Sequence, residues 1–293
     1  MANYVLISDG SCDLTFEEAK ELNVEVVPFY VSFDSSEQYK EGQDFNVRDF
    51  YQKMVDNPFV FPKTSLPSPK DYMDCFEKYL KDGKDIICMC ITSKFSGSYN
   101  SARNAAEMLL EEFPDRKITV IDTMVNTVLQ GLVVREACKL RDNGMSYDDL
   151  VKDVEEKKTT GRIFFTVKGL SYLQHGGRIG KVASIIGDLL KISPLICLKE
   201  GEIFSNGKVM FRNRALLKVK DNVLTHLEEV QANKDDYILA IGYGYDIEEA
   251  KQFKEMIAKA LPGYEMVFSQ IGATIGVHTG PHPLGVGLIK KFK

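Results

Sequence analysis

The sequence predicts an α/β protein of two domains. The chain has 293 residues, which fits two domains of roughly 100–200 residues each. Its first half alternates short apolar segments with helical segments, and at about residue 160 this pattern changes to closely spaced strand-like segments. We therefore expect an N-terminal α/β/α domain on a parallel sheet over residues 1–160. Residues 161–293 should form an α+β domain with a mainly antiparallel sheet.

The composition is that of an ordinary globular protein. Hydrophobic residues make up 44% of the chain and charged residues 27%, which excludes a disordered or fibrous class. The net charge of −5 offers no basic surface to nucleic acid or to an anionic membrane. We therefore expect no nucleic-acid partner.

The chain shows no segment that would direct it into or across a membrane. Its first residues contain no basic stretch and reach the charged Asp9 too early for a signal peptide. No apolar run approaches the roughly 18 residues that a membrane span requires, so we expect no stable membrane insertion. The six cysteines are scattered through mostly apolar segments, which indicates buried free thiols in a reducing compartment. These features predict a cytoplasmic protein.

The first half should form a parallel sheet covered by helices on both faces. Helix starts are indicated by a capping box at Thr15, by a cap at Asn46 and by the pair Ser68-Pro69. Continuous apolar strands separated by helices are typical of buried parallel sheets. The strands are expected over residues 4–8, 24–31, 85–91 and 117–122, with helices after residue 98 and over residues 127–143.

Polar segments follow three of these strands. Residues 9–11, 92–98 and 122–123 come directly after the strands that end beside them. Because the carboxyl ends of parallel strands meet at one edge of a sheet, we expect these segments to lie along a common edge. Ligands of open α/β sheets bind at this edge.

The second half should contain shorter elements. Strands are expected over residues 163–167, 194–199, 201–204, 237–243 and 265–271, and helices over residues 181–190 and 213–229. The segment from Gly272 to Gly287 is rich in glycine, which indicates close approach of the backbone to a ligand or to another element.

The strongest local signal is the segment Thr92-Ser-Lys-Phe-Ser-Gly-Ser98. It places Ser96, Gly97 and Ser98 between a strand and the start of a helix. Free backbone N–H groups and the positive end of the helix dipole would attract an anion there, with serine hydroxyls as further donors. The same residues would also serve as a plain helix cap, and both interpretations stay open.

Two further segments carry candidate donors. Thr64 and Ser65 lie in a hydroxyl-rich segment that Pro67 and Pro69 stiffen, which suits either a ligand clamp or an ordinary turn. His278 lies in the glycine-rich segment and would be a donor to a carboxylate, a proton shuttle or a structural histidine.

Several familiar sites are absent from the sequence. Residues 175–181 lack the spacing of a phosphate-binding loop, and residues 242–244 lack the third glycine of a dinucleotide-binding turn. No serine lies in a Gly-x-Ser-x-Gly elbow, and no His-Glu-x-x-His motif occurs. The four histidines form no cluster with cysteines or carboxylates. We expect neither a metal nor a bound nucleotide cofactor.

Taken in order, five motifs resemble the DegV family of fatty-acid-binding proteins, which includes the FakB subunits of bacterial fatty acid kinase. The resemblance extends over residues 8–281, nearly the whole chain. The motifs are Ser8-Asp-Gly-Ser-Cys-Asp-Leu14, Thr64-Ser-Leu-Pro-Ser-Pro69, Thr92-Ser-Lys-Phe-Ser-Gly-Ser-Tyr99, Tyr172-Leu-Gln-His-Gly-Gly-Arg-Ile-Gly180 and Ile271-Gly-Ala-Thr-Ile-Gly-Val-His-Thr-Gly-Pro281.

The resemblance implies a long-chain fatty acid buried between the two domains. On the matching positions, the hydroxyl of Ser96 and the amide of Gly97 would hold the carboxylate, with Thr64 and His278 as further donors. Ser65 and Thr279 would be additional ligand contacts.

The resemblance also implies a carrier without catalytic residues of its own. Such a carrier presents its fatty acid to a separate ATP-dependent kinase, which forms acyl phosphate for phospholipid synthesis. Arg178, Arg212 and Arg214 would be candidate contacts to that partner or its nucleotide. The sequence departs from the family pattern at His282, between two prolines, and at Gly10.

Two other functions stay open from the residues. In a serine-dependent acyl hydrolase or transferase, Ser96 would be the nucleophile and His278 its base, oriented by Asp9 or Asp122. In a regulatory or scaffold protein, the lipid would act only as a signal.

Overall fold

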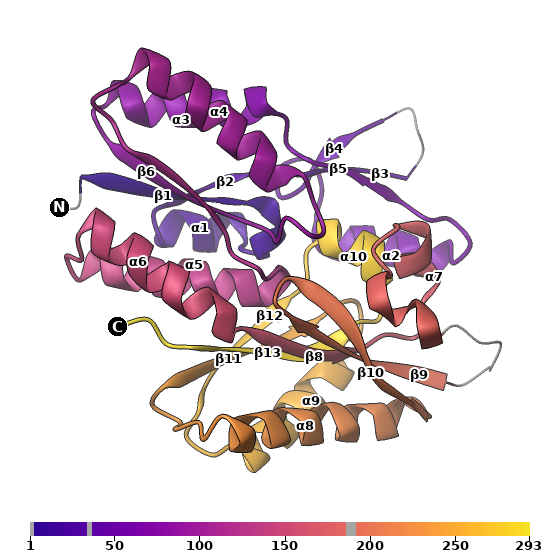
Figure 1. Cartoon of the computed structure of the whole chain (residues 1–293). Helices are drawn as coiled ribbons and strands as arrows, with labels where there is room; N and C mark the ends of the chain where they lie inside the picture. The colour runs from indigo at the N-terminus through magenta and orange to yellow at the C-terminus, as the bar shows by residue number, and fades with distance from the viewer. Residues whose placement is uncertain (1–2, 34–36, 186–191) are drawn as a thin grey trace.

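The computed structural model describes residues 3–33, 37–185 and 192–293 and shows a layered α/β molecule. Two sheets lie one above the other in Figure 1, with helices above the first, between the two and below the second. The predicted class, a parallel sheet followed by a mainly antiparallel one, is confirmed.

The first sheet is entirely parallel and has the order β2-β1-β6-β7. Its strands carry apolar and β-branched residues, and most of them are buried because helices cover both faces. The strands are β1 (Tyr4–Asp9), β2 (Val24–Val27), β6 (Asp85–Cys90) and β7 (Ile118–Asp122).

Most helices of the first half begin where the sequence indicates. Thr15 and Ser68 each form a complete capping box, and the side chain of Asn46 accepts a hydrogen bond from the amide of Arg48. The short helix Tyr147–Lys157 was missed. The helices are η1 (Gly10–Cys12), α1 (Phe16–Glu21), α2 (Val47–Asp56), α3 (Pro69–Lys81), α4 (Ser98–Glu112), α5 (Thr127–Asp142), α6 (Tyr147–Lys157) and η2 (Lys158–Thr160).

The strand predicted over residues 24–31 is wrong as a single element. Its first part pairs with β1, whereas the chain leaves the sheet at Pro28 and Phe29. Proline has no N–H group to donate to a sheet, which favours a break at this position. The following residues form a small antiparallel sheet of β3 (Tyr30–Ser32), β4 (Tyr39–Lys40) and β5 (Lys63–Ser65).

The second sheet has the order β10-β9-β8-β13-β11-β12, and only β11 and β12 are parallel neighbours. That pair is joined by the unpredicted helix α9 (Ile247–Ala260). The strands are β8 (Arg162–Thr166), β9 (Ile192–Lys199), β10 (Glu202–Met210), β11 (Tyr237–Tyr243), β12 (Glu265–Gln270) and β13 (Leu284–Lys290).

The remaining helices include one in the glycine-rich segment. The helices are α7 (Ser171–His175), η3 (Gly180–Ile185), α8 (Arg212–Glu229) and α10 (Ala273–Thr279). The helix predicted over residues 181–190 is a 3₁₀ turn up to Ile185, and its remaining residues lie outside the described part of the chain. The six cysteines are buried and free, as predicted.

Helix α5 lies between the two sheets and is buried on most sides (Figure 1). One apolar cluster therefore joins residues of β1 and β6 to residues of β8, β9 and β11 through this helix. In the opposite direction, α10 from the second half of the chain packs on α2 from the first. The two halves share apolar clusters, so packing does not mark a boundary between them. The division into domains at residue 160 stays a prediction.

Candidate functional site

The order of the first sheet predicts where a ligand would bind. From β1 the chain crosses to β2 on one side and later to β6 on the other, so the strand order reverses between β1 and β6. Such a switch point opens a crevice at the carboxyl ends of the two strands. Asp9 ends β1, and Ile91 follows β6.

Asp9 connects the segments around this crevice through hydrogen bonds to its carboxylate. Its carboxylate is fully buried and accepts hydrogen bonds from the Ile91 amide (2.9 Å), Ser98 Oγ (2.8 Å) and Gln130 Nε2 (2.9 Å). Burial raises the pKa of Asp9, although these hydrogen bonds oppose the shift. The Ser93 amide donates to Asp122 in turn (3.2 Å), so the three polar segments meet at one edge, as predicted.

The turn that follows β6 contains the residues predicted to bind an anion. The Ser96 hydroxyl accepts a hydrogen bond from the Ser98 amide (3.2 Å), which leaves its own proton for another acceptor. Gly97 precedes α4 without a side-chain cap, and its amide has no acceptor within the described residues. The Ser98 side chain, also expected as a donor, instead points inward to Asp9 and Tyr72.

A cavity of about 330 Å³ opens beside this turn, between the two sheets. Its volume is within the range of small-molecule sites, roughly 300–1,000 Å³. One end carries hydroxyl, imidazole and guanidinium groups from four separate elements or loops. These residues are Thr64, Ser65, Ser96, Arg178, His278 and Thr279.

Thr64 and His278 are paired at the polar end. Thr64 Oγ1 lies 3.1 Å from His278 Nε2, which links β5 to α10 in the lining of the cavity. The other ring nitrogen, Nδ1, is enclosed without a hydrogen-bond partner among the described residues. A Cβ on Gly176 would clash with it, so only glycine fits beside the ring.

His278 is neutral at physiological pH. Burial, and then the positive charge of Arg178, lower its pKa to about 4. Arg178 is fixed near the mouth by hydrogen bonds from Nε to the Phe95 carbonyl (3.1 Å) and from Nη1 to the Gly176 carbonyl (2.7 Å). The polar end therefore offers a cation and neutral donors together.

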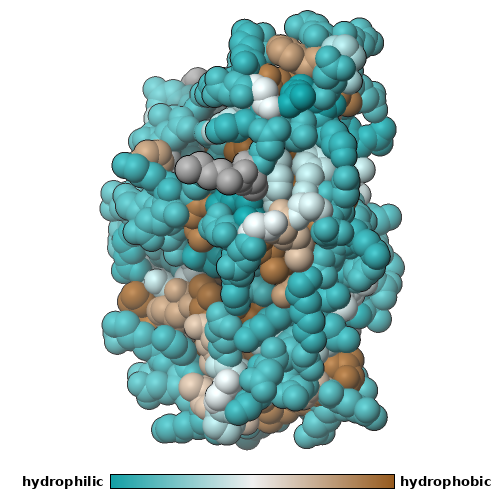
Figure 2. All heavy atoms as spheres, turned by 90° about the vertical axis from the view of Figure 1, so that its left-hand side faces the viewer, coloured by the Kyte–Doolittle hydropathy of each residue, from teal (hydrophilic) through white to brown (hydrophobic). Residues whose placement is uncertain are grey.

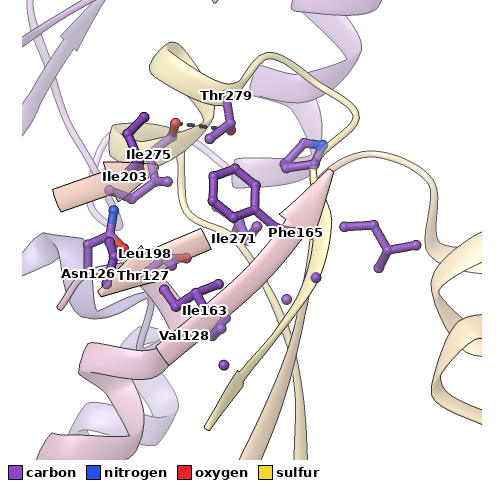
Figure 3. Close-up of a pocket in the computed structure, with 15 residues that line it drawn as sticks. Asn126, Thr127, Val128, Ile163, Phe165, Leu198, Ile203, Ile271, Ile275 and Thr279 are labelled. Atoms are coloured by element: carbon purple, nitrogen blue, oxygen red, sulfur yellow. Dashed lines mark hydrogen bonds between the residues drawn. The ribbon is translucent and has the colours of Figure 1, made fainter. Parts of the chain in front are cut away.

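The other end of the cavity is apolar. It continues into a narrow space of about 40 Å³ whose lining residues include Phe165, Ile203 and Ile275 of the larger cavity. Figure 3 shows side chains of β8, β10 and α10 turned toward this space, and Thr279 Oγ1 donating within α10 to the Ile275 carbonyl at 3.1 Å. The further apolar lining includes Val128, Ile163, Leu198, Ile271 and Leu284.

Glycines in the second sheet make room for this apolar end. Gly242 of β11 pairs with Gly285 of β13, and Gly287 lies two residues further along β13. A Cβ on Gly242 would lie 2.9 Å from Val128 Cγ2, and one on Gly287 would lie 3.1 Å from Leu129 Cβ. The glycines therefore let α5 approach the sheet while the narrow space stays open.

Two of the arginines predicted to contact a partner do not line the cavity. Arg212 begins α8 and binds Glu249 with Nη2 2.9 Å from Oε2. Arg214 is exposed, with its guanidinium 5.7 Å from the centre of the Phe211 ring. His282, which lies between two prolines where the sequence departs from the family pattern, binds Asp246 (2.5 Å) and does not line the cavity.

Sequence reasoning missed the apolar walls and one polar residue. Asn126 lines both spaces, and its side chain does not cap α5 although it precedes that helix. In the sequence, an asparagine before a helix is typical of an ordinary cap, so no local signal marked Asn126. The apolar walls come from Phe29, Leu66, Phe95, Phe165 and Leu173, which look like ordinary core residues in the sequence.

The geometry does not assemble a catalytic triad. No hydrogen bond joins Ser96 to His278 within the described ranges. Asp9 is engaged with Ile91 and Ser98, and Asp122 accepts from the amides of Ser93 and Met124. Neither carboxylate orients the imidazole.

The described residues form neither a metal-binding cluster nor a membrane-spanning helix. In the part of the chain that the structure describes, no three histidine, cysteine or carboxylate side chains are grouped so as to hold a metal ion. Across the same residues, no helix has both the length and the apolar character to cross a bilayer. The face turned to the viewer in Figure 2 is largely hydrophilic, with hydrophobic residues in small separate patches.

Three comparisons place the chain among known proteins. Residues 3–291 match the family model described as "Uncharacterised protein, DegV family". A DegV domain-containing protein of Clostridium perfringens is 31% identical over 288 residues, covering 98% of this chain and 97% of the relative.

Solved structures agree over the whole fold. A protein from Eubacterium ventriosum described as binding a fatty acid, stearic acid, has 40% identity and a TM-score of 0.93, with 98% of each chain covered. A DegV family protein from Thermus thermophilus described by its fatty acid binding has 28% identity and a TM-score of 0.87, covering 98% of this chain and 99% of the other. The chain therefore belongs to the DegV family.

Proposed function

We propose that this protein binds one long-chain fatty acid, with the carboxylate at the polar end of the cavity and the acyl chain toward the apolar end. The observation that carries this proposal is a single cavity with unused donors at one end and aliphatic and aromatic walls at the other. The Eubacterium ventriosum protein, described as binding stearic acid, supports the same ligand class.

The physical chemistry of the polar end suits a carboxylate. A buried carboxylate is unfavourable by several kcal/mol unless charge-assisted hydrogen bonds replace its hydration. Ser96 Oγ and the Gly97 amide have donor capacity that no described residue uses, and Arg178 supplies the compensating positive charge. Ser65 lies beside Thr64 at the cavity and would be a further contact.

The pairing of Thr64 with His278 directs one more donor toward the ligand. A neutral imidazole has one N–H group, and an enclosed N–H without an acceptor is more costly than an enclosed bare nitrogen. The proton of His278 therefore belongs on Nε2, where it donates to Thr64 Oγ1. The Thr64 hydroxyl is then free to donate to a carboxylate, and His278 fixes its direction.

The acyl chain would supply most of the affinity. Each buried methylene contributes about 0.8 kcal/mol, so acids of different length should differ steeply in affinity. Thr279 faces both spaces, but its hydroxyl donates to Ile275, so its part in binding would be contact rather than donation.

We further propose a carrier role in the cytoplasm. The protein would present the bound carboxylate to a separate ATP-dependent kinase that forms acyl phosphate for phospholipid synthesis. Arg178, at the cavity mouth, would face the incoming nucleotide, whereas Arg212 and Arg214 would contact the partner at a distance from the ligand. Acyl phosphate formed only in a mixture of kinase, ATP and lipid-loaded protein would support this role.

Comparing an acid with its alcohol tests the ligand assignment. Lipid-free protein should bind oleic acid and bind oleyl alcohol at least about tenfold more weakly, because the alcohol cannot make the charge-assisted hydrogen bonds. Isothermal titration calorimetry measures both affinities. Equal affinities would exclude the polar end as a carboxylate site, and no binding of either would exclude the function.

Labelling with a fluorophosphonate tests the hydrolase alternative. Because Ser96 has no hydrogen bond to His278, its hydroxyl lacks a base, and we expect no covalent adduct. An adduct on Ser96 detected by peptide mass spectrometry would instead support acyl transfer.

A further inference from the structure

Helix α10 begins without a cap of its own. Gly272 stands at its N-cap position and has no side chain to accept hydrogen bonds from the first amides of the helix. The carboxylate of Glu41, distant in the sequence, takes this place. Glu41 accepts hydrogen bonds from the amides of Ala273 and Thr274 (3.0 Å for Thr274) and from Thr274 Oγ1.

Glu41 also connects α10 to Phe29, another residue of the cavity lining. It lies between β4 and α2 in the first half of the chain, and its own amide donates to the carbonyl of Phe29 (3.0 Å). Phe29 lines the cavity, as does Thr274. Glu41 is half-buried, and its carboxylate lies against the first turn of α10.

A second carboxylate faces the same point of the backbone. Asp13 ends η1 and is buried, with Oδ2 accepting from Thr127 Oγ1. Its Oδ1 is enclosed and has no hydrogen-bond partner among the residues that the structure describes. A Cβ on Gly272 would clash with Glu41 Oε1 and would lie 2.8 Å from Asp13 Oδ1. Only a glycine leaves room for both carboxyl groups.

The pair has no cation to balance it. The hydrogen-bond partners of both side chains are amides and hydroxyls, and neither forms an ion pair within the described ranges. The titratable groups nearby are Tyr51 of α2 and Cys12 of η1, which burial keeps protonated. Two adjacent buried carboxylates without a cation share a proton, because both cannot ionise at low cost.

We propose that Asp13 and Glu41 act as a proton-sharing latch that positions α10 for ligand binding and loosens it when both carboxyl groups ionise. This inference rests on the proposed function, because α10 supplies Thr274, Ile275, His278 and Thr279 to the cavity. With one proton in the pair, Glu41 caps the helix and Asp13 is neutral. Without that proton, mutual repulsion acts at the first turn of α10.

The direction of the effect follows from the carboxyl groups. Burial raises the pKa of Glu41, and burial with the neighbouring charge of Glu41 raises the pKa of Asp13 well above its ordinary value. Groups with raised pKa values stabilise the folded state at low pH, and that stabilisation is lost as pH rises through the folded-state pKa. The latch therefore holds in mild acid and weakens toward alkaline pH.

Hydrogen exchange in the ligand-free protein tests the latch without reference to any ligand. Protection of the Ala273 and Thr274 amides, corrected for intrinsic exchange, should fall at least about tenfold between about pH 5 and about pH 9. Asp13→Asn keeps the shape and removes one charge, so its protection should be independent of pH. Asp44→Asn, an exposed carboxylate in the same loop, should behave as wild type. A wild-type pH profile in Asp13→Asn would overturn the proposal.

Binding of an alkyl sulfonate then tests the link to ligand retention. The sulfonate stays ionised at every pH used, so its own titration does not enter. Its affinity for wild type should weaken about tenfold or more over the same range, while Asp13→Asn should show a flat profile. Glu41→Gln, which keeps one acceptor oxygen, should bind more weakly than wild type at acidic pH. If neither the sulfonate nor oleic acid binds, the proposed function fails while the exchange result still judges the latch.

Discussion

Single residues at the polar end of the cavity are notable for the hydrogen-bonding capacity that they keep free. Ser98, two residues from Ser96, is engaged with Asp9 and Tyr72 and is unavailable to a ligand. The Ser96 hydroxyl receives a bond from the backbone and retains its proton. Two serines of the same turn thus have different roles, which the sequence could not distinguish because both would serve equally well near a helix start.

Replacing Ser96 should weaken fatty-acid binding. The Ser96→Ala variant loses a hydrogen bond to a charged group, worth about 1.5–3 kcal/mol, so the dissociation constant should rise about ten- to hundredfold. Calorimetric titration with oleic acid measures the change. Ser93→Ala alters an exposed serine of the same turn outside the cavity and should leave the affinity unchanged. An equal affinity in Ser96→Ala would remove this residue from the site.

His278 should make the stability of the ligand-free protein depend on pH. Its pKa is lowered from 6.5 to about 4, so the unfolded chain binds the proton more readily and stability falls as pH drops through that interval. The loss should reach about 3 kcal/mol at most. Urea unfolding of wild type and His278→Gln measures it, and the variant should show a flatter dependence. The same slope in both proteins would contradict a buried neutral imidazole.

Among the elements, the glycines of β11 and β13 set the width of the apolar end. The Gly242→Ala variant should destabilise the protein by about 1–3 kcal/mol, because its Cβ would press against Val128. It should also shift the preference toward shorter acids, which competition between acids of different length would show. Gly169→Ala, whose Cβ would meet nothing within 4 Å, is the control. An unchanged length preference would mean that the chain does not reach this end.

The carboxyl edge of the first sheet depends on Asp9. The Asp9→Ala variant would leave the Ile91 amide, Ser98 Oγ and Gln130 Nε2 without their acceptor, and each buried group left unsatisfied costs about 1–3 kcal/mol. Urea unfolding should show a loss of this size. Asp122→Ala, at a more accessible carboxylate of the same edge, should destabilise less. Equal effects would argue against Asp9 as the organising residue.

Elements with strong local sequence signals were predicted, whereas elements without such signals were not. The capping box at Thr15, the pair Ser68-Pro69 and the continuous apolar strands were sufficient to place much of the first half. The helix α10 and the strand β13 were not recognised, because glycines weaken both helical and strand preferences. Their glycines are explained only by tertiary contacts, such as Gly276 against Tyr51 and Gly287 against Leu129.

For the molecule as a whole, the site lies where elements from both halves meet. The residues that line it range in sequence from Phe29 to Thr279. Helix α10, from the second half of the chain, packs on α2 from the first. The sequence predicted Thr64, Ser96 and His278 as a group only through the family resemblance, since no local pattern relates positions so far apart. The resemblance also gave Arg212 as a candidate partner contact, and the structure places it in an ion pair with Glu249.

The lipid content of the purified protein tests the central claim most directly. Native mass spectrometry of the protein isolated from a bacterial host should show an added mass of a few hundred daltons, released on denaturation and identified as a long-chain fatty acid. Ser96→Ala should carry less of it under the same conditions, because the carboxylate loses a donor. A protein that is isolated empty and still gains no mass after incubation with oleic or palmitic acid would contradict the account.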